Sequence, residues 1–471
     1  MNIENQIIRY YVQDDESLKE YLELYEIPKP EHIFLLEKRM SRDIADIFYG
    51  IGYKNKSELI KNCNSLRFLQ QCVSNEDHKH WHGSFCRDRY CPICSHIKAH
   101  KESQMLEDIF ASIKKDNNYK RSYVVFVTFT QKNVPVGELK NELNKINSAI
   151  KKILTTEPLF KDSTEFTIDK KTGKKKKKKR LALCQGTIRH LEITSGYSQE
   201  RRRIEFHPHL HMILLVKKSY WSECNKALQW TNEKLQAMWQ KHMDLDYNPN
   251  VDIRLAKNKD IYKAELKLGS RQDTDDNTNS ISEGGKNHIS ELNPLGVIKE
   301  LCKYSTKETD IIKFDQKEDG RIKINWNDTK IILKEIYISM HQKRTLILTG
   351  AFKKTKERLY GKKEAEDLVA EMTEADLIQV FRHRCKKCGS AITEHLFRYY
   401  PKSKNYKELK GEANIENYKQ NVYTKVNAKA LKDIEQSKKE DKLLEWLEED
   451  YFETKKTDVS DQTTSDLIKS L

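Results

Sequence analysis

The sequence lacks three features, each of which would have assigned the chain to a broad class. No run of 18 or more apolar residues occurs among its 471 residues, so no transmembrane helix is predicted. The first residues, MNIENQIIRYY, lack the basic and then apolar layout of a signal peptide. No G-x-x-x-x-G-K-S/T motif is present, so the chain has no recognisable P-loop helicase. We therefore expect a cytoplasmic protein with no membrane partner and no ATP-driven motor of its own.

What the sequence has in excess is positive charge. Lys and Arg number 86 against 71 Asp and Glu, which gives a formal net charge of +15 and a pI near 9.0. This balance favours a polyanionic partner such as nucleic acid, although excess lysine also serves solubility. The ten cysteines of a long cytosolic chain are more typical of thiols or metal ligands than of disulfides.

The segment FHPHLHMILLV at residues 206–216 is the most informative stretch. A strand points alternate side chains to opposite faces, so His207, His209 and His211 share one face and the apolar residues share the other. Imidazoles about 7 Å apart at the backbone can converge on one cation. The alternative is a histidine-rich surface strand. The apolar face is predicted to pack on a core and consists of Leu210, Met212, Leu214 and Val216.

A second segment, PLGVIKELCKYSTKETD at residues 294–310, has helical periodicity and begins at Asn293-Pro294, a cap and a first-turn proline. One helix face carries a carboxylate, a phenol and two ammonium groups, from Glu300, Lys303, Tyr304 and Lys307. The opposite face, predicted to pack on a sheet, carries Ile298, Leu301, Cys302 and Ser305. The alternative is a solvated charged face with a half-buried tyrosine.

The two segments together suggest phosphodiester chemistry. A metal held by two imidazoles polarises a phosphoryl oxygen, and an ammonium group such as that of Lys307 favours the phenolate of Tyr304. In-line attack by that phenolate leaves a 5′-phosphotyrosine and a free 3′-OH. Glu300 lies one helical turn before Tyr304, where it can act as a general base.

Four motifs in this order, FVTFT (126–130), LEIT (191–194), HPHLH (207–211) and E-x-x-x-Y-x-x-K (300–307), resemble those of the HUH endonucleases. The chain is most similar to the replication initiator (Rep) proteins of rolling-circle plasmids from Gram-positive bacteria. The similarity runs from about residue 63 to residue 353 and includes YWSECNKALQW, VDIRLAK and RTLILTGAFK.

This resemblance implies a role for each matching residue. His209 and His211 match the two metal ligands, and Glu192 matches a carboxylate that completes the metal site. His207 is not required by the family pattern, and we expect it to support a ligand or face DNA rather than bind the metal. Tyr304 matches the nicking tyrosine. In the tyrosine helix, Lys307 matches the motif lysine, and Glu300 matches a carboxylate that ends replication through water. Oxygen and imidazole ligands suit Mg²⁺ or Mn²⁺.

The resemblance also implies an α+β fold with a central five-stranded antiparallel sheet and flanking helices. Composition and patterning add a Cys-rich N-terminal zinc region and a helical C-terminal region. We expect three regions: a helical, Cys-rich part at 1–118, the HUH endonuclease domain at 119–352, and a charged, mostly helical part at 353–471 with a disordered end. Within the second region, patterning predicts strands at 121–131, 183–194, 205–216 and 251–257, and helices at 137–154 and 219–242.

The segment FCRDRYCPIC contains a C-x4-C-x2-C array, from Cys86, Cys91 and Cys94, that is typical of structural zinc. Candidates for the fourth ligand are Cys63, Cys72 and His82; we favour Cys63, because its CNSLRF context resembles a family position. Free thiols are the alternative interpretation. The flanking Arg87 and Arg89 are candidate DNA contacts or ordinary surface charges, and Lys303 and Arg254 are further candidates.

Two other segments have open interpretations. Cys385-x-x-Cys388 has no second pair nearby, and the candidates for completing a metal site there are Cys72, His383 and His395. The lysine-rich segment 170–180 is either a finger that grasps phosphates or the solvated tip of a hairpin.

We therefore expect an origin-nicking plasmid initiator that depends on a host helicase and a host DNA polymerase. One alternative is an HUH transposase or mobilisation relaxase, which shares the chemistry. The other is a non-catalytic, zinc-stabilised DNA-binding regulator.

Overall fold

The computed structural model describes residues 10–11, 30–168, 175–255, 298, 301, 308–361 and 384–424. The chain divides into two compact units: unit 1 comprises Met1–Asn64 and Phe85–Ala370, and unit 2 comprises Ser65–Ser84 and Glu371–Leu471. Unit 2 is thus assembled from two segments that are distant in sequence. The three predicted regions have other boundaries, and their functions stay a prediction, because a division by compactness assigns no function.

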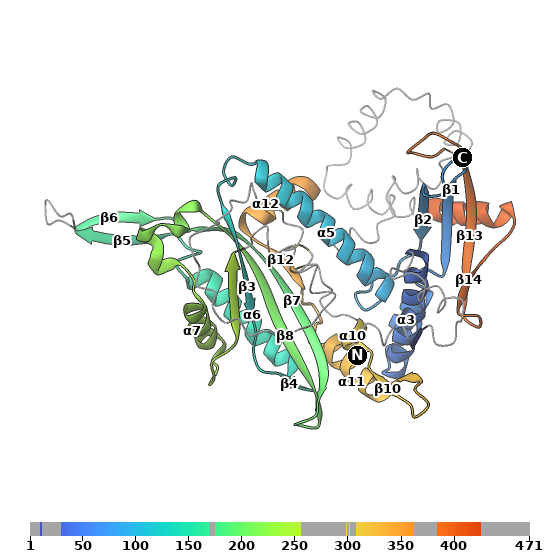
Figure 1. Ribbon diagram of the computed structural model, residues 1–471, viewed down its shortest axis with the longest axis horizontal. Helices are drawn as coiled ribbons and strands as arrows, with labels where there is room; N and C mark the ends of the chain where they lie inside the picture. Colours follow the sequence, from blue (N-terminus) through green and yellow to red (C-terminus); the bar gives the residue numbers. More distant parts are fainter. Residues whose placement is uncertain are drawn as a thin grey trace, which may run out of the picture. The chain divides into compact units, whose positions relative to one another are not determined.

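Unit 1 is built on an antiparallel sheet with the strand order β12-β7-β8-β3-β9 (Figure 1). A short strand, β4, pairs with β8 beside this path and makes the sheet six-stranded rather than five-stranded. The mixed α and β character and the antiparallel pairing agree with the prediction. The strands are β3 (Tyr123–Phe129), β4 (Val134–Pro135), β7 (Cys184–Ser198), β8 (Arg203–Val216), β9 (Val251–Leu255) and β12 (Leu346–Leu348).

The hairpin of β7 and β8 forms the centre of this sheet. From Phe206 to His211, β8 alternates apolar residues or proline with histidine, so the strand register decides which face of the sheet carries the histidines. The register pairs Leu191 with Leu210 and places Glu192 opposite His209. Glu192 therefore shares one face of the sheet with His209 and His211.

The first face of the sheet is largely apolar. Leu210, Met212, Leu214 and Val216 pack there with buried residues of α6 (Leu139–Thr156) and α7 (Asn232–Met243). A Thr231 N-cap, whose side chain accepts a hydrogen bond from the Lys234 N–H, begins α7.

The predicted helix at 219–242 is wrong over its first half. Residues Lys218–Trp221 and Glu223–Leu228 form two 3₁₀ turns, η1 and η2, before α7 begins. Trp230 and Trp239 are buried in the first-face core, and the Trp239 indole donates to the carbonyl of Thr130 at 3.2 Å. Both tryptophans therefore serve packing.

The second face is covered at one end by α5 (Pro92–Lys115) and α12 (Gly350–Tyr360), which pack on Val124, Phe126 and Ile213. The remaining helices of unit 1 are α3 (Pro30–Gly50), α4 (Lys54–Asn62), α10 (Glu308–Ile311) and α11 (Trp326–Ser339), and a two-stranded sheet joins β10 (Phe314–Gln316) and β11 (Ile322–Ile324).

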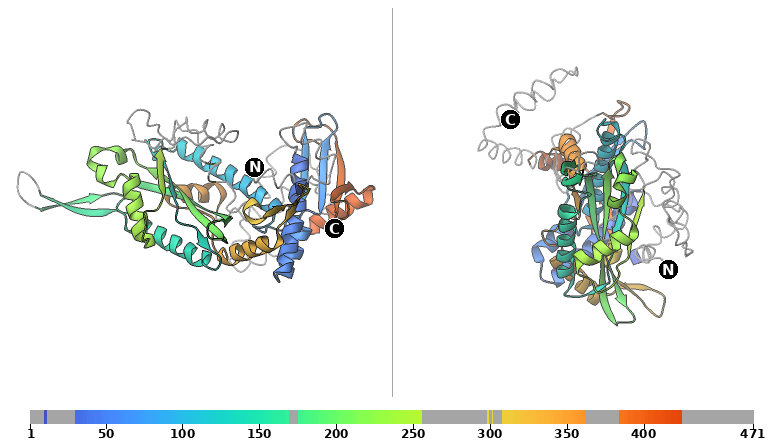
Figure 2. Two further views of the ribbon diagram at one scale, coloured as in Figure 1. Left: turned by 60° about the horizontal axis from the view of Figure 1, so that its bottom comes forward. Right: turned by 90° about the vertical axis from the view of Figure 1, so that its left-hand side faces the viewer.

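The lysine-rich segment forms part of a hairpin. Strand β6 (Lys175–Arg180) pairs with β5 (Ser163–Ile168), and this two-stranded ribbon extends away from the central sheet (Figures 1 and 2). The pairing agrees with the hairpin interpretation. Residues 169–174 lie outside the described part of the chain.

Unit 2 contains a four-stranded antiparallel sheet in the order β14-β13-β1-β2. Its strands are β1 (Leu66–Cys72), β2 (Lys79–Gly83), β13 (Ile392–Tyr400) and β14 (Asn405–Glu408). The helical patterning predicted for 1–118 and for the region after 353 is therefore wrong at these strands. Their stability comes from pairing across the chain, as between Leu69 and His395, which local patterning does not register.

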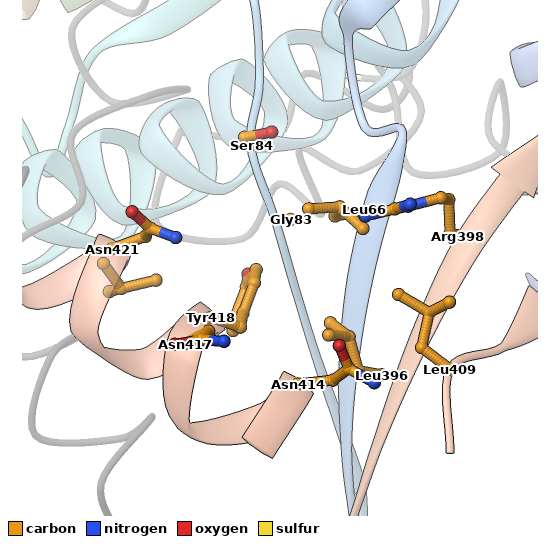
Figure 3. Close-up of a pocket in the computed structure, with 11 residues that line it drawn as sticks. Leu66, Gly83, Ser84, Leu396, Arg398, Leu409, Asn414, Asn417, Tyr418 and Asn421 are labelled. Carbon is orange, nitrogen blue, oxygen red and sulfur yellow. The ribbon is translucent and has the colours of Figure 1, made fainter. Parts of the chain in front are cut away.

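One face of the unit 2 sheet packs on a helix over residues 412–424. Phe68, Leu396, Tyr418 and Val422 form a small buried cluster between the two. A pocket of about 430 Å³ opens beside it, with Leu66 and Leu396 on the sheet side and Asn414, Asn417 and Asn421 on the helix side (Figure 3). The predicted disordered tail after residue 453 and the insertion at 268–288 lie outside the described residues.

Candidate active site

The second face of the unit 1 sheet changes from apolar to polar along β8. Ile213 belongs to the core under α5, whereas His211, His209 and His207 follow on the same face towards the start of the strand. Because β7 runs antiparallel to β8, Glu192 joins this polar part. The histidine strand predicted from alternation is therefore present, with its histidines away from the first-face core.

Glu192 and His211 are in direct contact. The His211 Nε2 atom lies 3.2 Å from the Glu192 Oε2 atom, and the other ring nitrogen, Nδ1, lies 3.1 Å from the hydroxyl of Thr128 on β3. Contacts at both nitrogens fix the orientation of the imidazole. Sequence reasoning did not single out Thr128, although it lies in the FVTFT motif at a position that faces the histidines.

His209 and His207 extend the group along the strand. The ring centroids of His209 and His211 are 6.0 Å apart, and those of His207 and His209 are 4.5 Å apart. In the described part of the chain, only two clusters, both rich in cysteine, bring three or more ligand atoms within 4.8 Å of one another. Coordination of one ion by Glu192, His209 and His211 therefore requires the His209 side chain to turn towards the other two.

The electrostatics of this group favour forms that can bind a metal. Burial, reinforced by His207, lowers the pKa of His209 to about 4, so its imidazole is neutral at pH 7. Burial raises the pKa of Glu192, but the hydrogen bond from His211 and the nearby histidines together hold that pKa below its usual value. A carboxylate therefore lies beside a neutral imidazole, which is the donor set that hard or borderline divalent metals accept.

His190 was missed by sequence reasoning. It lies on β7 opposite His211 and is buried, and burial lowers its pKa to about 3. Its Nδ1 atom is buried without a hydrogen-bond partner among the described residues, and the same holds for the Nε2 atom of His207. The signal was available, because His190 and Glu192 alternate as the β8 histidines do.

The tyrosine segment falls largely outside the described residues, including Glu300, Lys303, Tyr304 and Lys307. Ile298 and Leu301, two of its predicted sheet-facing residues, are described and fully buried in the second-face core. Their burial agrees with the predicted packing side of this helix. Ile298 and Leu301 thus lie in the core on the same face of the sheet as the histidines.

Arg254 lies on the same face, at the edge strand β9. Its register partner is Phe126, and its guanidinium carbon lies 4.8 Å from the centre of that ring. The Arg254 Nε atom is 3.7 Å from the Asp252 Oδ2 atom, and both side chains are more than half exposed. A cation on the rim of the polar face is accessible to a phosphate.

The cysteines predicted to bind zinc lie together in unit 1. The Sγ atoms of Cys63, Cys86, Cys91 and Cys94 all lie within 4.8 Å of one another, and the Cys63–Cys94 and Cys86–Cys94 distances are each 3.6 Å. These distances exclude disulfides and are close to the edge of a tetrahedron with 2.3 Å Zn–S bonds, about 3.8 Å. The other two candidates, Cys72 and His82, are not part of this cluster.

A buried cation lies against the cluster. The Lys38 ammonium donates to the carbonyl oxygens of Lys61 and Cys63, and burial lowers its pKa to about 8 against the opposing effect of the Cys63 and Cys91 sulfurs. Although burial raises the pKa of the Cys91 thiol, hydrogen bonds from Cys63 and its neighbours lower it well below its usual value. The Cys91 sulfur, which favours the thiolate, therefore lies close to a buried ammonium.

The two arginines of the cysteine loop differ. Arg89 donates to the carbonyl of Lys343 at 2.9 Å, which ties the loop to the residues after α11. Arg87 has a positive φ of 63°. Arg89 therefore has a structural contact, and the DNA-binding role of both residues stays a prediction.

An antiparallel sheet that presents histidines and a carboxylate on one face, with a four-cysteine cluster in the same unit, defines an α+β protein with two candidate metal sites. A family model described as "Replication protein" matches residues 77–407, and the chain belongs to this family. This confirms the predicted resemblance to Rep proteins and favours replication over the transposase and regulator alternatives.

Curated relatives carry the name "Protein rep". One from Streptococcus pneumoniae is 26% identical over 324 residues, which cover 68% of this chain and 78% of the relative. One from Bacillus amyloliquefaciens is 25% identical over 378 residues, covering 80% and 89% of the two chains. No solved structure matches significantly. None of the helices in the described part of the chain is long and apolar enough to cross a membrane.

Proposed function

We propose that this chain initiates plasmid rolling-circle replication by nicking one strand of the origin DNA, with the phenol oxygen of Tyr304 as the nucleophile. The observation that carries this proposal is that Ile298 and Leu301, from the segment that holds Tyr304, pack on the sheet face that carries His209 and His211. In this proposal the Tyr304 hydroxyl and the metal-donor histidines of that sheet face form one active site. Membership of the replication protein family supports the same conclusion.

The donor set fits Mg²⁺ or Mn²⁺, because the site offers neutral imidazole nitrogens and an ionised carboxylate on one half-buried face. His209, His211 and Glu192 would hold the ion. When bound, it polarises a phosphoryl oxygen and offsets the charge that develops on the phosphate. Thr128 keeps the His211 ring oriented.

The nicking step exchanges one phosphate ester for another. The Tyr304 oxygen attacks phosphorus, the bond to the 3′-oxygen breaks, and that oxygen leaves with the bonding electrons and takes a proton. The products are a 5′-phosphotyrosine and a 3′-OH that primes leading-strand synthesis. Lys307, one turn from Tyr304 on the predicted helix, stabilises the phenolate that attacks. Because the ester is conserved, the step needs no ATP.

Glu300 ends the cycle in this proposal. Its carboxylate takes a proton from water, and the resulting nucleophile hydrolyses the phosphotyrosine instead of forming a second covalent complex. A helix places residues i and i+4 on one face, so Glu300 and Tyr304 act on the same phosphate.

Contacts to the DNA backbone come from cations around the site. Arg254 lies exposed on the rim of the polar face, and Lys303 is predicted beside Tyr304. Arg87 and the lysines of the β5–β6 hairpin offer further phosphate contacts. Without a P-loop motif, unwinding and elongation depend on a host helicase and a host DNA polymerase.

We also propose that Cys63, Cys86, Cys91 and Cys94 bind a structural Zn²⁺. Four sulfur ligands leave no open position for a substrate, so the ion stabilises the fold and does no chemistry. The chain leaves unit 1 after Asn64 and returns at Phe85. Cys63 and Cys86 flank the segment that belongs to unit 2, so the ion would link the two parts of unit 1 at the positions where the chain leaves and re-enters it.

The test is incubation of the protein with a single-stranded origin oligonucleotide and Mn²⁺, with wild type compared with Tyr304→Phe. We expect wild type to form a 5′-linked covalent adduct and Tyr304→Phe to form none. The matched control is Tyr197→Phe, which removes the hydroxyl of an exposed tyrosine on β7 and should nick as wild type does. Equal cleavage by wild type and Tyr304→Phe would contradict the proposal, and a chain that binds without cleaving would favour a regulator.

Glu300→Ala separates the two halves of the mechanism. This variant should form the adduct at a near-normal rate and release it slowly, so the adduct should accumulate. Unchanged turnover would remove Glu300 from the mechanism.

A further inference from the structure

Unit 2 contains a second group of metal-ligand side chains that has no role in nicking. The ligand atoms of Cys72, His78, Cys385 and Cys388 all lie within 4.8 Å of one another. Two of these residues come from the N-terminal segment of unit 2 and two from its C-terminal segment. Cys72 and Cys388 are 316 positions apart in the sequence.

The first pair of ligands is positioned by the loop between β1 and β2. Strand β1 ends at Cys72 and β2 begins at Lys79. The Cys72 N–H donates to the His78 carbonyl at 3.1 Å, and the His78 N–H donates to the Asn75 carbonyl at 3.1 Å. The Asn75 side chain accepts from the Asp77 N–H at 2.9 Å. These hydrogen bonds hold Cys72 and His78 close together at the two ends of the loop.

The second pair is held by a tight turn. The Gly389 N–H donates to the Cys385 carbonyl, and the Cys385 N–H donates to the Ser390 carbonyl, each at 2.8 Å. Gly389 has a φ of +73°, which a residue with a Cβ adopts only with strain. C-x-x-C-G in such a turn directs both sulfurs to one side, as in structural zinc knuckles.

A backbone contact brings the two loops together. The Val73 N–H donates to the Ala391 carbonyl at 3.0 Å, directly after the seven-residue ladder that pairs β1 with β13. The ligand loops therefore lie at the same end of the unit 2 sheet, and the sheet register fixes their separation.

The distances match a tetrahedral zinc site. The Sγ atoms of Cys72 and Cys388 are 3.4 Å apart, and the Cys385 Sγ atom lies 3.6 Å from the His78 Nδ1 atom. Bond lengths of about 2.3 Å for Zn–S and 2.0 to 2.1 Å for Zn–N place two sulfurs about 3.8 Å apart and a sulfur and a nitrogen about 3.6 Å apart. A disulfide needs about 2.05 Å between sulfurs and would leave Cys385 and His78 unused.

The small core of unit 2 is a further reason to expect a stabilising ion there. The buried cluster in its described part is small: Phe68, Leu396, Tyr418 and Val422, with three partly buried residues packed against it. A core of this size contributes too little to stabilise a small domain, and such domains usually contain disulfides or metals.

We propose that Cys72, His78, Cys385 and Cys388 bind a structural Zn²⁺ that fastens the β1–β2 hairpin to the C-terminal strands of unit 2. Binding of the ion is then part of the folding free energy of this unit. The proposal is independent of nicking and of the four-cysteine cluster in unit 1.

The first test is zinc content, measured by mass spectrometry of metals on the full-length protein after removal of loosely bound ions. Wild type should hold two equivalents of zinc per chain and Cys388→Ser one. The matched control, Cys224→Ser, changes an exposed cysteine outside both clusters and should keep two. Equal zinc content in wild type and Cys388→Ser would overturn the proposal, whatever the occupancy of the four-cysteine cluster in unit 1.

Hydrogen exchange distinguishes loss of the ion from general unfolding. In Cys388→Ser, amides of β1 and β13 should lose at least tenfold in protection, whereas those of β7 and β8 in unit 1 should match wild type. Unchanged protection in β1 and β13 would overturn the proposal, as would a Cys72–Cys388 disulfide found by thiol counting under denaturing, non-reducing conditions.

Cobalt provides a direct view of the ligands. Co²⁺ exchanged into wild type should show intense thiolate charge-transfer absorption from both sites, and Cys385→Ser should lose the part due to the second site. A spectrum identical to that of wild type would contradict coordination by Cys385.

Discussion

The two faces of β8 belong to one strand and differ in almost every physical property. On the first face, Met212 and Leu214 are fully buried among apolar side chains of α6 and α7. On the second face, His209 and His211 lie beside Glu192, and the pKa values of His209 and Glu192 are lowered. The period-2 geometry of a strand therefore separates stability from chemistry at neighbouring positions.

This difference predicts opposite phenotypes for adjacent residues. Substitution on the apolar face removes packing and costs folding free energy. On the polar face, burial of the imidazoles and the carboxylate already lowers the free energy of unfolding, because these groups lose hydration. Their substitution should therefore lower activity and change stability little.

The largest effect is expected for His211→Ala. Loss of a ligand that helps to polarise the phosphate should remove several kcal/mol of transition-state stabilisation, or about 10³-fold in the rate of adduct formation. The rate is measured with an origin oligonucleotide at saturating Mn²⁺, and the urea midpoint is measured in parallel. A variant that loses stability in proportion to its activity would show that the two faces are not separate.

Leu214→Ala should give the opposite result. Truncation of a fully buried leucine costs about 2 to 5 kcal/mol of unfolding free energy, through lost transfer free energy and a residual cavity. Urea titration measures this change. The matched control is Leu181→Ala, an exposed leucine that should change stability by less than about 0.5 kcal/mol. A cost at Leu214 as small as that at Leu181 would contradict the assignment of the first face as core.

Glu192→Gln keeps the shape of the side chain and removes its charge. The metal should then bind about 10- to 100-fold more weakly, because a carboxylate ligand is replaced by an amide and the His211 contact is weakened. The Mn²⁺ concentration for half-maximal nicking measures this change. An unaltered midpoint would show that Glu192 is not a ligand.

The smallest effect concerns Glu205, which lies on β8 and accepts hydrogen bonds from Arg203 at 2.9 Å and Arg201 at 3.1 Å. Burial raises the pKa of Glu205, but these arginines outweigh it and lower the pKa below its usual value. A carboxylate whose pKa is depressed in the folded state contributes stability above its unfolded pKa, and that stability is lost as the pH falls through the folded value.

Glu205→Gln should therefore cost up to about 1 kcal/mol at pH 7, since both arginines are nearly half exposed. The difference from wild type should close below about pH 4, as seen in unfolding curves at several pH values. Nicking should be unchanged. A difference that persists at pH 3 would rule out the ionised carboxylate as its source.

The sequence predicted those parts of the structure that depend on local alternation. Strands β3, β7 and β8 and the side of each histidine followed from period-2 patterning. The structure places the Cys63 sulfur beside those of the cysteine array, and zinc binding there stays a prediction. The first half of the predicted helix 219–242 was wrong, because the apolar spacing that suits α7 continues into residues that form 3₁₀ turns.

Most of the features that the sequence did not predict depend on pairing between segments that are distant in the sequence. The ladder of β1 with β13 joins Phe68 to Leu396, and neither segment alone has a partner that its own patterning could indicate. For the same reason Cys72 could be considered as a ligand for Cys385 and Cys388, but His78 could not be selected over His395. The structure shows His395 engaged with Glu408 at 2.7 Å.

The most direct measurement for the central claim is peptide mapping of the covalent complex by mass spectrometry, after reaction with the origin oligonucleotide and nuclease trimming. The account predicts a nucleotide phosphate mass on the peptide that contains Tyr304, with no adduct on peptides that contain Tyr197 or Tyr220. An adduct on another residue, or efficient cleavage with no covalent species at any time point, would contradict it.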